Sequence, residues 1–305
     1  MARFNINKFP NRYFKEVICL NKFNGKSNFI QKLISSFHDY DNLYFVSKYY
    51  DGIISNYLNY TWDENTIKFF AGCLIQCLDE LRKENIIHKD LYFQNLVLDE
   101  KGYINLIDFH ISMEYKNRSQ NIENHHSFGF IKVCPPEMKE GFVYDFNSDY
   151  YRLGSLLYFI IFRKYPNDIK DKKNITDIKI NLKETKNFSF ACIDFINKLI
   201  ISDFRQRIGY QNINELKKHD FFINFSWNDL IDGKMNSPFG KIKRDNRDLC
   251  KKKYIFKKKL FLKTKLLKND TFKNLIFSYD NINNYVVSDI FNSINNISIK
   301  SEKIY

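Results

Sequence analysis

Residues 86–112 read IIHKDLYFQNLVLDEKGYINLIDFHIS and decide how the rest of the sequence is interpreted. An acid, Asp90, follows a long helix-forming segment, and Asn95 stands five residues further along. A second acid, Asp108, comes after two short apolar runs that are joined by the turn-forming residues DEKG. One carboxylate at this spacing can orient and deprotonate a hydroxyl, while an amide oxygen and a second carboxylate can bind Mg²⁺. The grouping therefore indicates phosphoryl transfer, in which the protein mostly positions groups and stabilises charge.

The segment before this stretch predicts the clearest helix of the chain. Thr61 followed by Glu64 predicts a capping box at its beginning. A second helix, buried on all sides, is expected at 148–162, where the apolar character is nearly continuous. In the first helix, apolar residues recur at the three- and four-residue steps of one helix face: Ile67, Phe70, Leu74, Leu78 and Leu81.

Shorter elements complete a predicted α+β fold that is mainly helical. The polar residues 112–130 show little periodicity, which indicates a loop. Further helices fit residues 12–20, 191–201 and 213–219. Strand-like runs occur at residues 29–36, 43–49, 95–98 and 103–107.

The composition limits the class of protein. The chain has 305 residues, of which 44% are hydrophobic and 17% aromatic, as is typical of a globular protein. Residues 241–268 hold 13 Lys or Arg against two Asp, so this segment supplies most of the net charge of +13. The six cysteines form no CxxC pair, which argues against zinc. The beginning of the sequence shows no apolar signal core, and the apolar run at 156–162 is too short to span a bilayer, so a cytoplasmic protein is expected.

The stretch at 86–112 resembles the catalytic and metal-binding loops of eukaryotic protein kinases, whose signatures are H-R-D-L-x-x-x-N and D-F-G. The corresponding residues here are HKDLYFQN at 88–95 and DFH at 108–110. The resemblance implies ATP and Mg²⁺ as cofactors and a protein as substrate. It also implies the roles of three residues: Asp90 as the catalytic base, and Asn95 and Asp108 as metal ligands that also contact the nucleotide.

Further motifs of the family follow in the expected order. PPE at 135–137 corresponds to A-P-E, and the resemblance implies that Arg207 is the partner of its buried ion pair. Asp149 matches the aspartate that opens a helix in the family and anchors the catalytic loop. Glu16, on the first predicted helix, stands where the family has a glutamate that pairs with the ATP-binding lysine. It is therefore expected to support nucleotide binding.

The end of the kinase-like region resembles the AGC group of serine/threonine kinases. Three stretches carry this resemblance: HDFF at 219–222, FSWNDL at 225–230 and SPF at 237–239. DFHI at 108–111 and YDFNSD at 144–149 resemble the YANK family within that group. FSY at 277–279 is interpreted either as a remnant of the hydrophobic motif of the AGC tail or as an ordinary apolar patch.

Four departures from the family pattern bear on activity. Nothing before residue 12 resembles a glycine-rich loop and no strand carries the ATP-binding lysine, so the small lobe is expected to be largely missing. Tyr92 takes the place of the catalytic-loop lysine, and loss of one such donor costs about 10²–10³ in rate. His110 replaces the glycine of D-F-G and limits its backbone freedom. Lys89 replaces the arginine and lacks its planar fork.

Two functions therefore stay open. In the first, the chain is part of an active serine/threonine kinase whose ATP-binding lobe lies upstream of Met1. In the second, it is a pseudokinase that binds partners as a scaffold without turnover. The retained base and metal-ligand positions favour the enzyme, whereas Tyr92 and His110 favour the scaffold.

The predicted organisation has a remnant of the small lobe at 1–50, the large lobe at 51–239 and a basic tail at 240–305. Leucines and a phenylalanine interleave with the lysines of residues 241–268, which suits weak contact with an anionic membrane. The alternative is a solvated tail that docks on the kinase body. No recognised reading module accompanies the charge, so nucleic acid is not an expected partner, and we expect a monomer.

Overall fold

The computed structural model describes residues 2–5, 10–38, 42–50, 52–116, 129–139, 145–169, 180, 187–240 and 277–278. The chain divides into two compact units. The smaller unit comprises Met1–Asn24, Lys32–Lys48 and Lys252–Tyr305, and the larger unit comprises Gly25–Gln31 and Tyr49–Lys251. The basic segment at 241–268 and most of the predicted loop at 112–130 lie outside the described residues.

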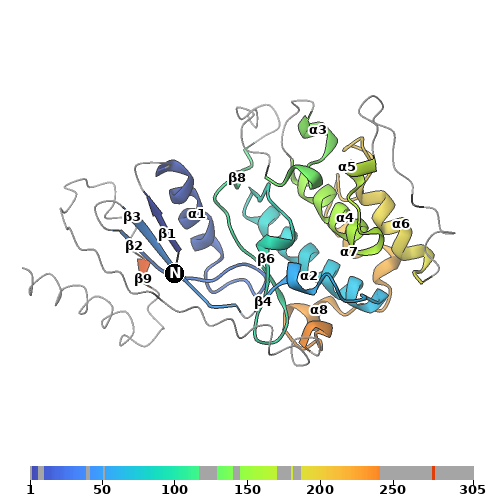
Figure 1. The fold of residues 1–305 in the computed structure, drawn as a ribbon, viewed down its shortest axis with the longest axis horizontal. Helices are drawn as coiled ribbons and strands as arrows, with labels where there is room; N and C mark the ends of the chain where they lie inside the picture. Colours follow the sequence, from blue (N-terminus) through green and yellow to red (C-terminus); the bar gives the residue numbers. More distant parts are fainter. Residues whose placement is uncertain are drawn as a thin grey trace, which may run out of the picture. The chain divides into compact units, whose positions relative to one another are not determined.

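In its described residues, the smaller unit combines an antiparallel sheet with one helix (Figure 1). Helix α1 (Pro10–Phe23) begins on a proline, whose fixed φ suits the first helical turn, and it buries Val17, Leu20 and Phe23. The helix predicted at 12–20 is therefore confirmed, with longer ends. The sheet has the order β1 (Ala2–Asn5), β3 (Asn42–Ser47), β2 (Leu33–His38) and β9 (Phe277–Ser278).

The strand predicted at 29–36 is wrong in its first half, because only β2 belongs to that sheet. The residues before it pair instead with Leu106 in the larger unit. The backbone N–H of Leu106 donates to the oxygen of Phe29, and that of Gln31 donates to the oxygen of Leu106, each at 2.9 Å. The two halves of a single apolar run in the sequence thus pair with strands of two different sheets.

The larger unit is mainly helical (Figure 1), which confirms the predicted fold class. Its helices are α2 (Glu64–Lys83), α3 (Pro136–Lys139), α4 (Phe146–Phe162), α5 (Pro166–Ile169), α6 (Phe190–Leu199), α7 (Asn214–Lys217) and α8 (Trp227–Ile231). Short 3₁₀ turns lie at Ile54–Tyr57, Phe93–Asn95, Ile131–Val133 and Asp220–Phe222. Its antiparallel strands are β4 (Gly52–Ile53) with β6 (Leu96–Leu98) and β7 (Ile104–Leu106), and β5 (Ile86–Ile87) with β8 (Met113–Glu114). The pairing of β6 with β7 confirms the predicted hairpin.

The beginning of α2 corrects one detail of the sequence analysis. Asp63, and not Thr61, caps the helix, because its side chain accepts a hydrogen bond from the backbone N–H of Thr66 at 2.7 Å. Glu64 therefore completes no capping box with Thr61. Its carboxylate instead accepts from the backbone N–H and the hydroxyl of Ser189 at 2.6 and 2.7 Å, just before α6.

Helix α4 packs against α2 and α6 and forms much of the core. Every residue from 146 to 158 is buried, which confirms the helix predicted to be buried on all sides. It begins two residues earlier than predicted, at Phe146, because Asp145 and Ser148 form a capping box there. A Cβ at Gly154 would lie 2.6 Å from the Cβ of Leu199 on α6, so only glycine allows these helices to approach so closely.

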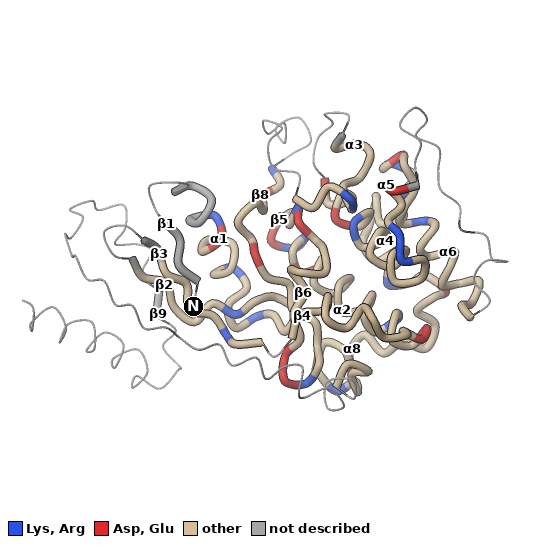
Figure 2. The backbone as a smooth tube through the Cα atoms, viewed as in Figure 1, with Lys and Arg blue, Asp and Glu red and all other residues tan. Residues whose placement is uncertain are grey.

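The described residues give three further findings on charge, thiols and membrane crossing. Both basic and acidic residues occur along the tube of the larger unit (Figure 2). Among the described residues, the cysteines are free thiols, and all of them are buried: Cys19, Cys73, Cys77, Cys134 and Cys192. In the part of the chain that the structure describes, no helix is both long enough and apolar enough to cross a membrane.

One ion-pair cluster between α2 and α7 gives a pH-dependent prediction. Asp79 lies 2.7 Å from Lys217 Nζ and 3.0 Å from Lys83 Nζ. Burial acts to raise the pKa of Asp79, but hydrogen bonds from these two lysines outweigh it, so the pKa is lowered. Because the unfolded value is about 3.9, the ionised carboxylate stabilises the fold above that pH, and this contribution is lost as the pH falls through the folded value.

Lys217→Met is therefore expected to lower the free energy of unfolding by about 1.5–3 kcal/mol at neutral pH. The loss should shrink near pH 3, where Asp79 becomes protonated in the unfolded chain. Urea unfolding at both pH values measures the difference, with Lys234→Met as a control, since Lys234 pairs with Asp232 on the exposed surface. An equal loss at both pH values would contradict the assignment.

Candidate active site

The loop that follows β5 is held by the carboxylate of Asp149, which lies in the first turn of α4. The backbone N–H of His88 donates to Asp149 Oδ2 at 2.7 Å, and that of Lys89 donates to Oδ1 at 3.1 Å. Asp149 is 2% exposed, and this burial raises the pKa of its carboxyl. The predicted anchoring of the loop by Asp149 is confirmed.

Asp90 is held by one neutral donor on each carboxylate oxygen. Asn95 Nδ2 donates to Asp90 Oδ2 at 2.9 Å and to the Asp90 backbone oxygen at 3.0 Å. The backbone N–H of Phe130 donates to Asp90 Oδ1 at 2.9 Å. Because Asn95 uses its amide nitrogen in this way, its amide oxygen is the atom that can bind a cation.

Asp108 comes directly after the hairpin and is brought towards Asn95 by the backbone. The N–H of Ile107 donates to the backbone oxygen of Asn95 at 3.0 Å. Burial acts to raise the pKa of Asp108, but the hydrogen bond and charge of His110 outweigh it and lower the pKa. The carboxylate is therefore ionised at neutral pH, as binding of a hard cation requires.

His88 joins the two acidic segments from the inside. Its side chain is fully buried, and its Nε2 lies 3.2 Å from the backbone oxygen of Ile107. Burial lowers the pKa of His88 despite the nearby carboxylates of Asp149, Asp90 and Asp108, so the ring is neutral at pH 7. Its ring also meets that of Phe109 edge to face, at 4.8 Å between centroids. The histidine thus connects the catalytic loop to the segment that carries Asp108.

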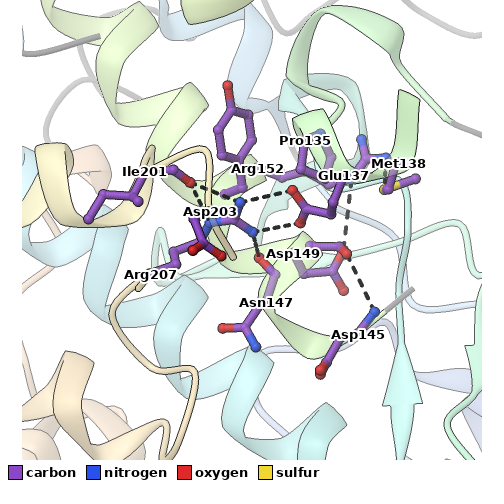
Figure 3. A network of polar contacts seen from close by, with 12 residues as sticks. Pro135, Glu137, Met138, Asp145, Asn147, Asp149, Arg152, Ile201, Asp203 and Arg207 are labelled. Carbon is purple, nitrogen blue, oxygen red and sulfur yellow. Dashed lines mark hydrogen bonds and ion pairs between the residues drawn. The ribbon is translucent and has the colours of Figure 1, made fainter. Parts of the chain in front are cut away.

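A second buried network of polar contacts holds the segment that begins at residue 129. Arg207 donates from Nη1 to Glu137 Oε1 at 2.7 Å and from Nη2 to Oε2 at 2.9 Å, in a bidentate pair (Figure 3). The same guanidinium donates to the backbone oxygens of Ile201 and Asn147. Arg207 is 1% exposed and Glu137 is 5% exposed. The predicted buried ion pair is confirmed.

The structure brings three of the predicted site residues together within the larger unit. Asp90, Asn95 and Asp108 lie within one connected set of loops in the larger unit. Glu16 lies on α1 of the smaller unit, where it is 5% exposed, and its link to the nucleotide stays a prediction. Phe130 is a site residue that the sequence analysis missed, because it contributes a backbone N–H that no residue type signals.

Comparison with known proteins agrees with this geometry. The family described as "Protein kinase domain" matches residues 3–222. The serine/threonine-protein kinase sgk-1 of Caenorhabditis elegans is 32% identical over 222 residues, covering 71% of this chain and 48% of that protein. A probable serine/threonine-protein kinase of Dictyostelium discoideum is 30% identical over 307 residues, covering 86% of this chain and 65% of its own length. A cGMP-dependent protein kinase of Drosophila melanogaster is 29% identical over 217 residues, covering 67% and 23%.

The fold and the site define a kinase-like protein, with a mainly helical unit that carries a loop aspartate, an asparagine and a second aspartate after a hairpin. The family model matches well more than half of this chain, so the chain belongs to the protein kinase domain family. Its serine/threonine kinase relatives make it AGC-like. The chain spans about half the length of the first of these relatives.

Proposed function

We propose that this chain, when an ATP-binding lobe completes it, transfers the γ-phosphoryl group of ATP to serine or threonine hydroxyls of protein substrates. Asp90 is the catalytic base, and Asn95 and Asp108 hold Mg²⁺. The observation that carries the proposal is the 2.9 Å hydrogen bond between Asn95 Nδ2 and Asp90 Oδ2. The bond from Ile107 N–H to the Asn95 backbone adds support, because it draws the second acid towards the same place.

The proposed reaction needs placement and charge from the protein more than covalent chemistry. The substrate hydroxyl oxygen forms a bond to the γ-phosphorus, while the bond from that phosphorus to the β–γ bridging oxygen breaks. The hydroxyl proton passes to a carboxylate oxygen of Asp90, and ADP is the leaving group. The two neutral donors on Asp90 leave the carboxylate oriented and able to accept this proton.

The donor set fits Mg²⁺. Asp108 has a lowered pKa and so offers a charged oxygen, and Asn95 has its amide nitrogen engaged, which turns its oxygen to a ligand role. Mg²⁺ prefers oxygen ligands and usually takes one or two carboxylates together with substrate phosphates. When bound, the ion neutralises charge on the phosphate oxygens.

The proposal assigns the rest of the chain by analogy with the family. Residues 1–50 would supply part of the small lobe, with Glu16 supporting nucleotide binding, and residues 51–239 the large lobe. Residues 240–305 would form an AGC-like tail.

The second candidate is a pseudokinase that binds partners without turnover. Tyr92 favours it, because a phenol stands where the family has a cation that faces the transferring phosphoryl group. Burial and the charges of Asp90 and Asp108 raise the pKa of Tyr92, so the side chain carries no charge at neutral pH. A neutral donor stabilises the developing phosphate charge less than an ammonium does.

Phosphotransfer from Mg·ATP to a serine/threonine peptide library separates the two candidates. We expect Mg²⁺-dependent transfer by the purified chain when it is joined to its ATP-binding lobe. In Asp108→Asn, the Mg²⁺ concentration for half-maximal rate should rise at least about tenfold, since even outer partners of metal ligands contribute that much. Asp232→Asn, which changes an exposed carboxylate 49% open to solvent, should have no effect. Absence of transfer by the wild-type chain joined to that lobe would favour the scaffold.

A further inference from the structure

Tyr92 and Phe130 form a stacked aromatic pair beside the catalytic loop. Their ring centroids are 5.3 Å apart and their planes differ by 23°, a geometry that contributes about 0.5–1.5 kcal/mol beyond burial. Tyr92 stands two residues after Asp90, whereas Phe130 belongs to the segment that returns to the loop before α3. The stack therefore connects two segments that are distant in the sequence.

Phe130 contacts Asp90 through its backbone while its ring contacts Tyr92. Its N–H donates to Asp90 Oδ1 at 2.9 Å. The preceding residue, Gly129, has a φ of 62°, and a Cβ there would clash with Asp90 Oδ1 and lie 2.6 Å from the backbone oxygen of Lys89. Only glycine allows this approach. The segment is thus shaped to bring one N–H to the carboxylate.

The stack continues through further ring contacts to Phe159 on α4, which itself meets Phe93 of the catalytic loop at 5.5 Å. The ring of Phe130 meets Tyr165 edge to face at 5.6 Å, and Tyr165 stacks on Phe159 at 4.5 Å and 27°. Phe159 lies in the last turn of α4, and Asp149 in the first turn of that helix holds the backbone of the catalytic loop. One rigid helix therefore supports Asp90 by two routes, through its backbone and through its carboxylate.

We propose that Tyr92 is a positioning residue for Asp90: its ring holds Phe130, and the Phe130 N–H fixes the carboxylate. Tyr92 acts through Phe130 and exchanges no proton with the substrate. Its catalytic consequence rests on the proposed function, but the positioning itself does not. Because the phenol is half-buried and neutral at pH 7, the ring can stack without the cost of desolvating a charge.

The Phe130 amide can be observed alone, because Gly-Phe occurs in this sequence at 129–130 and 141–142 and nowhere else. The full chain labelled with [1-¹³C]glycine and [¹⁵N]phenylalanine gives one correlated amide signal for each pair. Phe130→Leu identifies the first signal by its loss, and the second serves as an internal reference.

In the wild-type background, Asp90→Asn should move the Phe130 amide proton upfield, because the N–H loses a charged acceptor. In the Tyr92→Leu background, the same change should leave the signal nearly unmoved, because the N–H is no longer held on the carboxylate. Tyr92→Phe keeps the ring and should respond as the wild type does. If Tyr92→Leu does not fold, Tyr92→Met replaces it, since methionine fills similar space without a ring face.

Tyr44→Leu is the matched control. It removes a stack of similar geometry between Phe37 and Tyr44 in the smaller unit, with centroids 5.0 Å apart and planes at 15°. The Phe130 signal should keep its response to Asp90→Asn in this variant. An equally strong response in Tyr92→Leu, or a lost response in Tyr92→Phe, overturns the proposal.

Kinetics gives the second readout. Tyr92→Leu should lower kcat by about 10–100-fold, because small misplacement of a reacting group has effects of that size, and leave the KM for ATP unchanged. Tyr92→Phe should retain the rate. If the wild-type chain transfers no phosphate but its Phe130 response depends on Tyr92, the proposed function is wrong and the positioning role is supported. If the chain is active but its Phe130 response is the same with and without Tyr92, the proposed function is supported and the positioning role is wrong.

Discussion

Asp90→Asn is expected to lower kcat for phosphotransfer by about 10²–10⁴-fold, the contribution of a positioned general base. The amide oxygen can still accept from the Phe130 N–H, but it cannot take up the hydroxyl proton. The new amide nitrogen would also face Asn95 Nδ2, which now donates to the carboxylate at 2.9 Å. Initial rates at saturating Mg·ATP and peptide measure the loss.

Two comparisons make this result specific. Asp232→Asn makes the same chemical change at an exposed carboxylate of the larger unit and should keep the wild-type rate. Thermal unfolding should show Asp90→Asn to be folded, because the Asn95 amide keeps its bond to the Asp90 backbone oxygen at 3.0 Å. A variant that transfers phosphate at the wild-type rate would remove Asp90 from the role of base.

Arg207→Met is expected to lower the free energy of unfolding by about 3–5 kcal/mol, because it leaves the Glu137 carboxylate buried without its cation. The methionine also deprives the backbone oxygens of Ile201 and Asn147 of their donors. The side chain of Arg207 has no exposure to solvent and that of Glu137 has 6%, so water cannot replace the lost bonds. Chemical denaturation of the two proteins gives the difference.

The chain offers a close control for this change. Arg205 stands two residues earlier, is 70% exposed in its side chain and lies 3.9 Å from Asp203. Arg205→Met should therefore change the free energy of unfolding by less than about 1 kcal/mol. The double variant Glu137→Leu, Arg207→Met should recover part of the loss, since no buried charge remains. A single Arg207→Met as stable as Arg205→Met would show that the buried pair contributes little.

The elements that could be predicted from the sequence are those whose own residues show a clear local pattern. The continuous apolar run that became α4 and the DEKG turn between β6 and β7 needed no knowledge of distant partners. Strand β1 and the divided run at 29–36 could not be predicted in this way, because the pairing of short strands depends on neighbours far away in the chain. At the start of α2, Thr61 and Asp63 are both good caps, and only the structure shows that Asp63 reaches the free N–H.

The candidate site likewise has residues that the sequence could predict and residues that it could not. Asp90, Asn95 and Asp108 fall within one short stretch, so their spacing and residue types were enough to group them. The partnership of Glu137 with Arg207 spans 70 residues and came from the family resemblance alone. The contribution of Phe130 is a backbone N–H placed by Gly129 and by a ring stack, and neither feature leaves a pattern in the sequence.

The residues that hold the site in place are synthesised after the segments that they hold. Asp149 follows His88 by 61 residues, and Arg207 follows Glu137 by 70. At typical synthesis rates each support emerges roughly 3–14 s after the segment it fixes. The catalytic loop of a nascent chain therefore has no anchor during that interval, and exposed apolar surface makes such a chain prone to aggregation. Substitutions that weaken either support should reduce the yield of folded protein in cells more than the stability of the purified chain suggests.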